Sequence, residues 1–217
     1  MQILKLVSIN TKIPMGALLL LITIFLYFLT THFYVGTPSY VPITFFDVWA
    51  IHSPIWIWAY VSYYFYLIGI YLSVRDEQIL NQIYYSYLAA GIAGAIIFFF
   101  FPSTVLRELY PLAENQGLSE KMLGFIRTID SSRNCAPSMH VAFSTIAAMT
   151  FWRDRKESQK TRFFVTSWSL MIFYSTMATK QHYFLDVISG FVLGVVIFYT
   201  FGKVAFVSQT APREVQI

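Results

Sequence analysis

The fold of this chain is decided by an apolar stretch at residues 14–35, which reads PMGALLLLITIFLYFLTTHFYV. A helix that crosses a bilayer needs about 20 mostly apolar residues, so this stretch is long enough to form one. Five further apolar stretches follow along the chain, at residues 54–74, 83–101, 139–152, 163–179 and 183–207. We therefore expect one domain over residues 1–217 with an all-α fold, a six-span integral membrane helical bundle.

The composition supports a membrane protein. Of 217 residues, 57% are hydrophobic and only 12% are charged, whereas a soluble domain carries roughly 25% charged residues. So few charges cannot cover a soluble surface, which excludes a soluble enzyme and a disordered chain. The net charge is +4, but no basic tract is dense enough for a nucleic-acid partner. The single cysteine, Cys135, excludes an internal disulfide and a site of several thiolates.

Two of the stretches have unusual flanks. Residues 139–152 are short for a span, but Arg153 and Arg155 beyond them can snorkel to the interface and lengthen it. The first stretch follows Lys5 and Lys12, as a signal peptide would. No small-residue cleavage site comes after it, so we expect an uncleaved first span.

The basic residues indicate an orientation. Six spans place both termini on one side, and ten of the 15 Lys and Arg residues fall there, five of them in residues 153–162. By the positive-inside rule, the termini are cytoplasmic and the other side faces outward, as in a bacterial inner membrane with its periplasm. The cations left on the outer side are Arg107, Lys121, Arg127, Arg133 and Lys180.

A histidine and an aspartate lie four residues apart at the start of the last span. His182 and Asp186 share one helix face with Gly190 and Gly194, and these glycines allow a neighbouring helix to approach. An aspartate that accepts the ring N–H fixes the tautomer of the histidine and makes its other nitrogen a good nucleophile or base. The alternative is an interfacial histidine that caps a helix beside a solvated aspartate.

A second segment, residues 134–140, reads NCAPSMH. Proline suits the first turn of a helix, and the following amides of Ser138, Met139 and His140 then lack intrahelical partners. Together with the Ser138 hydroxyl they predict an anion site beside the His140 ring. An ordinary helix start is the alternative interpretation of this segment.

A third segment, residues 102–107, ends in Arg107, whose planar guanidinium suits phosphate. Taken alone, it is also typical of a headgroup contact. The three segments share one membrane face, and two histidines, a carboxylate and cations together suit phosphate chemistry. We expect no cofactor and no metal, although His140, His182 and Asp186 form a possible metal triad.

These segments resemble the signatures of the type 2 phosphatidic acid phosphatase superfamily, which read KxxxxxxRP, PSGH and SRxxxxxHxxxD. Residues 137–140 match the second signature with Met139 in place of glycine, and Ser175, His182 and Asp186 match the third in spacing. The resemblance implies that His182 attacks phosphorus, Asp186 orients His182, and His140 protonates the leaving alcohol and then activates water. It also implies that Ser138 and nearby amides hold the phosphate oxygens.

The sequence departs from those signatures at two cations. Arg107 matches the arginine of the first signature, but Phe100 stands at the lysine position, and Thr176 replaces the arginine of the third. Lys180 and Arg133 are close enough in sequence to substitute for the missing charges. We therefore expect Arg107, Ser138, Lys180 and Arg133 to bind the substrate phosphate.

The expected function is a membrane lipid phosphatase that hydrolyses a lipid phosphate monoester or diphosphate at the outer face. The sequence around residues 134–142 and 181–187 also resembles a divergent branch of the superfamily, the inositol phosphorylceramide and sphingomyelin synthases. That resemblance leaves open a lipid phosphotransferase, in which an alcohol replaces water as the acceptor. Two further alternatives are a phospholipid flippase and a lipid-binding scaffold without activity.

Overall fold

The computed structural model describes residues 2–113, 117–130 and 132–207. About 70% of the chain is helical, which agrees with the all-α prediction. The elements are β1 (Gln2–Leu4), α1 (Lys12–His32), β2 (Ser39–Tyr40), α2 (Phe45–Trp49), η1 (Pro54–Trp56), α3 (Ile57–Ser73), α4 (Glu77–Phe100), β3 (Ser103–Thr104), η2 (Arg107–Leu109), α5 (Leu118–Ile129), α6 (Met139–Arg153), α7 (Gln159–Ala178), α8 (Phe184–Gly202) and β4 (Ala205–Val207).

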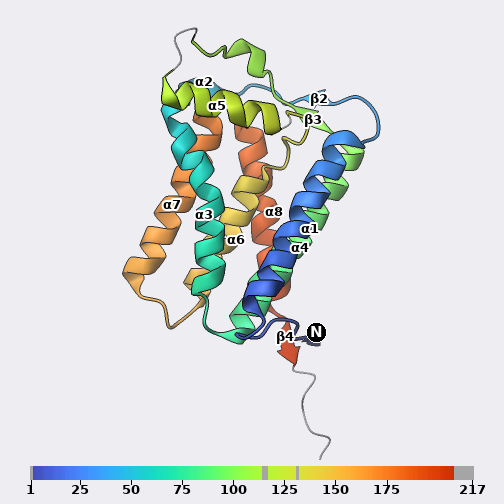
Figure 1. Ribbon diagram of the computed structural model, residues 1–217, viewed down its shortest axis with the longest axis vertical. Coiled ribbons are helices and arrows are strands. Elements are labelled where there is room, and N and C mark those ends of the chain that lie inside the picture. Colours follow the sequence, from blue (N-terminus) through green and yellow to red (C-terminus); the bar gives the residue numbers. More distant parts are fainter. Residues whose placement is uncertain (1, 114–116, 131, 208–217) are drawn as a thin grey trace, which may run out of the picture.

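The long helices α1, α3, α4, α6, α7 and α8 run side by side between two ends of the bundle (Figure 1). We call the end that carries α2 and α5 the site end, and the end where β1 pairs with β4 the terminal end. Four helical segments in the described part of the chain are long and apolar enough to cross a membrane: Lys12–His32, Pro54–Ser73, Glu77–Phe100 and Phe184–Gly202. They are consistent with an integral membrane protein.

The two remaining long helices, α6 and α7, are not both long and apolar enough to be identified as membrane spans, for different physical reasons. A helix of 15 residues, such as α6, is only about 22 Å long, against a hydrocarbon core of about 30 Å. Helix α7 is polar inside, where Ser169, Ser175 and Thr176 are buried, while Phe163 and Phe164 are exposed. For these two helices the six-span prediction stays a prediction.

Helix α6 is the centre of the bundle. It packs most closely against α8 and α7 and also contacts α4 and α3, and ten of its 15 residues are buried. A helix that is enclosed by others need not be long or strongly apolar, because its neighbours face the lipid in its place. The buried core around it includes Ile146, Ala147 and Phe151 from α6 and Ile172 from α7.

The predicted boundaries need three corrections. The third apolar stretch begins at Glu77 rather than residue 83, because the Asp76 carboxylate caps the helix at the amides of Gln78 and Ile79. The last helix ends at Gly202 rather than 207, because Ala205–Val207 pairs with β1. The fifth apolar stretch belongs to a helix that begins at Gln159 rather than residue 163, because the Ser158 hydroxyl caps it at the Thr161 amide.

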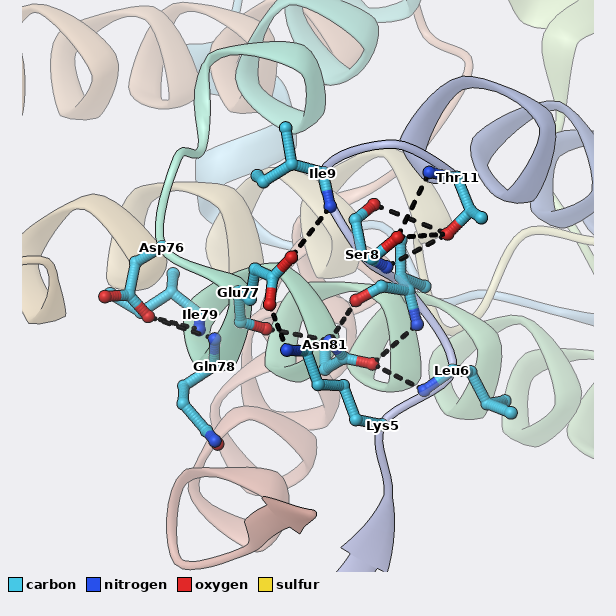
Figure 2. A network of polar contacts seen from close by, with 11 residues as sticks. Lys5, Leu6, Ser8, Ile9, Thr11, Asp76, Glu77, Gln78, Ile79 and Asn81 are labelled. Carbon is cyan, nitrogen blue, oxygen red and sulfur yellow. Dashed lines mark hydrogen bonds and ion pairs between the residues drawn. The ribbon is translucent and has the colours of Figure 1, made fainter. Parts of the chain in front are cut away.

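A polar network fixes the terminal end (Figure 2). The buried Asn81 side chain of α4 accepts hydrogen bonds from the amides of Leu6 and Val7 and donates to the Val7 carbonyl at 2.6 Å. Beside it, the Glu77 carboxylate pairs with Lys5 and accepts the Ile9 amide at 3.0 Å. These bonds satisfy an otherwise unpaired backbone and hold the N-terminal segment against α4.

We predict that the approach of α6 to α8 depends on Gly190 and Gly194. A Cβ at Gly194 would lie 2.6 Å from the Ala142 carbonyl oxygen, and one at Gly190 would overlap the Ser138 carbonyl. Gly194→Ala should therefore push the helices apart and lower the free energy of unfolding by about 1–3 kcal/mol. The matched control is Gly69→Ala on α3, where no atom lies within 4 Å. Thermal unfolding in detergent measures both variants, and equal melting temperatures would contradict the prediction.

Candidate active site

The loop between α7 and α8 positions His182. Helix α7 ends at Ala178, and Lys180 adopts a left-handed φ of 56°, which turns the chain back toward α8. The amides of Gln181 and His182 both donate to the Thr176 carbonyl at 3.0 Å. His182 is therefore held by its own backbone at the mouth of α8, with its side chain only 7% exposed.

Asp186 lies one turn below His182 and is fully buried. Its Oδ2 accepts the Tyr183 amide at 2.8 Å and lies 3.6 Å from the His182 Nδ1. That separation is slightly longer than a hydrogen bond, and a small rotation of either side chain closes it. The carboxylate thus faces Nδ1, which leaves Nε2 of His182 as the nitrogen available for chemistry.

The second histidine, His140, enters from the first turn of α6. Its ring centre lies 5.7 Å from that of His182. On its other sides it contacts Tyr60 and Tyr63 of α3, with ring centres at 4.3 and 4.4 Å. The two histidines and Asp186 therefore meet at the site end, as their positions in the sequence predicted.

The start of α6 differs from the prediction. Pro137 lies before the helix, Ser138 is its N-cap, and the first helical residue is Met139. The Ser138 amide was expected to be free for an anion, but it donates to the Asp186 carbonyl at 3.0 Å. This bond locks the start of α6 to the first turn of α8, so only the later amides of the first turn remain for a ligand.

Several buried polar atoms around this centre have no hydrogen-bond partner among the described residues. They are Ser138 Oγ, His140 Nε2, His182 Nδ1, Asp186 Oδ1 and both side-chain polar atoms of Gln181. Buried polar groups are normally paired, since leaving one unpaired costs about 1–3 kcal/mol. Such a concentration of unpaired donors and acceptors suits a site that receives a polar ligand.

Arg107 is tied to the site through Asp130, the residue that ends α5. Its Nη1 donates to the Asp130 carbonyl at 2.6 Å, and its Nη2 lies 4.0 Å from the Asp130 carboxylate. That carboxylate also accepts the hydroxyls of Tyr27 and Tyr60, the latter at 2.6 Å. The Tyr60 ring in turn contacts His140. Arg107 is therefore linked to His140 through Asp130 and Tyr60.

Arg127 on α5 is a second cation beside Arg107. It donates to the carbonyls of Tyr110 and Thr179 at 2.9 and 3.4 Å. The Nε of each arginine is buried and has no partner in the described chain. Burial and then the charge of Arg107 lower the pKa of Arg127, which indicates that two like charges are held close together. An anion between them would relieve the repulsion.

Sequence reasoning missed Arg127 and Asp130 as site residues. Arg127 was visible only as one of five outer cations, and Asp130 carried no motif. The amphipathic pattern of residues 118–129 is the sequence feature that could have pointed to them, because α5 carries Arg127 and ends at Asp130. The apolar face of that helix buries Leu123 and Ile126 against Ile57 and Tyr60.

Lys180 and Arg133 lie elsewhere than expected. The Lys180 Nζ donates to the carbonyls of Asp47 and Ala50, both at 2.6 Å, and lies 5.0 Å from the centre of the Tyr110 ring. Its charge therefore holds α2 and is not available as the phosphate ligand that the sequence suggested. Arg133 is exposed, with its guanidinium carbon 5.6 Å from the centre of the Tyr34 ring.

The residues best placed for a metal ion differ from the triad expected from sequence. Ligand atoms of Cys135, His182 and Asp186 lie within 4.8 Å of one another. Burial and the nearby Asp186 charge both raise the pKa of the Cys135 thiol. Binding of a metal ion at this cluster would therefore require the Cys135 thiol to lose its proton.

We predict a pH-dependent contribution of Asp130 to stability. Burial raises the pKa of the Asp130 carboxyl, but Arg107, His140 and two tyrosine hydroxyls outweigh burial and hold this pKa below its ordinary value. Its stabilising effect is then complete above an ordinary aspartate pKa of about 3.9 and is lost as the pH falls through the lower folded value. Asp130→Asn should cost about 1–3 kcal/mol at neutral pH.

Melting curves between about pH 7 and pH 3 test this, and the variant should decline less steeply than the wild type below about pH 5. Glu120→Gln, which removes a carboxylate from the same helix, should melt as the wild type does. Parallel declines in Asp130→Asn and the wild type would refute the assignment.

Comparison with known proteins identifies the family of this chain. No curated protein and no solved structure matches the chain. A family model described as the PAP2 superfamily matches residues 44–200, which include both histidines, Asp186, Arg107 and Arg127. Members of this superfamily are phosphatases. Because the match covers well over half of the 217 residues, the chain belongs to the PAP2 superfamily.

Proposed function

We propose that this protein is a six-span membrane enzyme that hydrolyses the phosphate monoester or diphosphate of a lipid through a phosphohistidine intermediate. The observation that carries the proposal is the meeting of the His140 and His182 rings at 5.7 Å, above a buried carboxylate. The termini are cytoplasmic in this proposal, and the site end faces the outer side of the membrane, in keeping with the distribution of Lys and Arg.

In the first step, His182 Nε2 attacks the phosphorus. A bond forms between nitrogen and phosphorus while the bond from phosphorus to the lipid oxygen breaks, and His140 donates a proton to the leaving alcohol. Asp186 faces the other ring nitrogen of His182 at 3.6 Å and stabilises the positive charge that develops on the ring. The ring of His140 is held between Tyr60 and Tyr63, which fixes its direction.

In the second step, His140 removes a proton from water, and the water oxygen attacks the phosphohistidine. The bond between nitrogen and phosphorus breaks, and inorganic phosphate leaves with the oxygen of that water. His182 thereby returns to its starting state. One histidine serves as acid and then as base, so the two must lie on opposite sides of the same phosphorus.

Arg107 and Arg127 bind the phosphate oxygens in this proposal. Each has a buried Nε without a partner in the described residues, and two cations suit the charge of the transition state. Arg107 stands at the arginine position of the first signature, and Arg127 supplies a charge in place of the family cations that are absent at Phe100 and Thr176. The Ser138 hydroxyl adds a further donor from the start of α6. Lys180 and Arg133, which the sequence suggested, are left out of this set.

The surroundings of the site suit a lipid. At the site end, α2 and α5 expose large apolar side chains, among them Phe45, Trp49, Leu118 and Phe125. Aromatic and apolar residues at the rim of a helical bundle typically lie in the membrane interface. A lipid can keep its tail in the bilayer while its phosphate enters the bundle from this rim.

We expect His182→Ala to abolish phosphate release from lipid phosphates, and His140→Ala to lower the rate by about 10²–10⁴-fold. The assay uses purified protein and a panel that includes phosphatidic acid and a polyprenyl diphosphate. His32→Ala, at the exposed end of α1, is the control and should keep full activity. Undiminished turnover in either of the first two variants would refute the mechanism.

The same assay separates the phosphotransferase. If a lipid alcohol is required and the phospho-headgroup appears on it instead of in solution, the acceptor in the second step is that alcohol. The histidine variants would still be inactive, because both reactions share the first step. Lipid movement across vesicles without any phosphate chemistry would instead support the flippase, and lipid binding alone would support the scaffold.

We further expect activity without a metal ion. Every step above uses only side chains of this chain and water, and metal binding at Cys135, His182 and Asp186 would require loss of the Cys135 proton. Phosphate release should therefore be unchanged after dialysis against a strong chelator. Loss of phosphate release after chelation, with recovery on addition of a divalent cation, would contradict this expectation.

A further inference from the structure

A basic pocket lies at the terminal end of the bundle, opposite the proposed active site. It has a volume of about 720 Å³ and is formed by the start of α4, the end of α6 and the loop that leads to α7. Its lining residues are Asp76, Ile79, Trp152, Arg153, Asp154, Arg155, Lys156 and Arg162. Four of them are cations and two are carboxylates, so the pocket carries an excess of positive charge.

The two carboxylates are already engaged. Asp76 caps α4 and pairs with Lys156 at 3.2 Å. Asp154 is buried and accepts the Lys156 amide at 2.9 Å. Neither carboxylate forms an ion pair with an arginine side chain in the described contacts, and the pocket lining keeps a net charge of +2, from four cations and two carboxylates.

Arg162 is held in place beside this charge. Its Nη2 donates to the Asp154 carbonyl at 2.9 Å, and its guanidinium carbon lies 5.8 Å from the centre of the Trp152 ring. Its Nε is buried and has no partner among the described residues. A fixed guanidinium with a spare buried donor is suited to an anionic oxygen, because little side-chain entropy is lost on binding.

An apolar groove adjoins the basic pocket. It has a volume of about 360 Å³ and is lined by Met149, Trp152, Arg153, Phe198 and Tyr199. Trp152 and Arg153 line both cavities, so the groove adjoins the basic pocket at the end of α6. A phosphate or another small anion would fill only the basic part, whereas a molecule with a charged head and an apolar tail fits both.

We propose that this composite pocket binds an anionic phospholipid, with its phosphate headgroup among Arg153, Arg155 and Arg162 and an acyl chain in the adjoining groove. The site lies at the end of α6 remote from His140, so it is separate from the catalytic centre. A lipid bound there would brace the loop between α6 and α7, whose helices surround the active site at the other end.

Native mass spectrometry of the full-length protein in a neutral detergent tests the proposal. The probes are phosphatidylglycerol and phosphatidylcholine with identical acyl chains. The wild type should bind the anionic lipid more tightly, and Arg153→Gln and Arg155→Gln should each weaken that binding about five-fold, the value of one basic residue at an anionic lipid surface. Both side chains are exposed, so melting without lipid should be unchanged and should verify folding.

Two control variants carry the same change in charge. Lys160→Gln lies in the first turn of α7 and does not line the pocket, and Lys121→Gln lies on the exposed surface of α5 at the site end, outside the proposed phosphate-binding residues. Both should bind phosphatidylglycerol as the wild type does. Equal weakening in Lys160→Gln would overturn the proposal in favour of a general charge effect. Weakening in Lys121→Gln alone would overturn it in favour of a lipid bound at the site end.

A competition arm distinguishes a lipid from a free anion. Inorganic phosphate and glycerophosphoglycerol, which lack acyl chains, should displace phosphatidylglycerol at least about ten-fold less effectively than a second anionic lipid does. Displacement by inorganic phosphate at equal concentration would overturn the lipid assignment. Failure of the phosphatase assay would leave these binding results unchanged, because no residue at the site end takes part in them.

Discussion

The structure depends on the close approach of α6 to α8. At Gly190 and Gly194 the backbone of α6 occupies the space that a side chain would need, and the Ser138 amide donates to the Asp186 carbonyl at 3.0 Å. This contact brings His140, in the first turn of α6, close to His182 and Asp186 at the start of α8. The polar side chains at the starts of the two helices therefore lie together in the bundle interior instead of facing lipid.

The charges at the site end are placed by backbone carbonyls more than by carboxylates. Lys180 is bound by two carbonyls of the α2 segment, and burial lowers its pKa, while Arg107 and Arg127 each donate to a carbonyl and retain a buried Nε. Carbonyls fix the direction of a cation without cancelling its charge. Arg107 is the exception, because its Nη2 also lies 4.0 Å from the Asp130 carboxylate. Arg127 has no carboxylate partner among the described ion pairs, so its charge remains for the proposed phosphate ligand.

The sequence predicted those parts of the molecule that depend on local spacing. The spacing of four predicted that His182 and Asp186 lie close together, although His182 precedes α8, whose N-cap is Tyr183. The apolar runs predicted the long helices to within a few residues, apart from the start of α4 and the end of α8. Arg127 and Asp130 could not be found in that way, because α5 reaches the site only through the packing of Leu123 and Ile126 on α3 and η1. The contacts of Lys180 could not be predicted from the sequence, because a φ of 56° and the position of α2 decide where its side chain goes.

The two ends of the bundle therefore use basic residues in opposite ways. At the site end, Arg107 and Arg127 are held by backbone carbonyls and each keeps a buried Nε, which suits the preorganised charge that the proposed catalysis on a phosphate requires. At the terminal end, exposed arginines of the 153–162 loop surround an open pocket that continues into an apolar groove. In the proposed orientation, the positive-inside rule alone accounts for a surplus of cations at the terminal end. That rule does not require a pocket, or an Arg162 whose buried Nε has no partner among the described residues. That second feature is what distinguishes a binding site from an orientation signal.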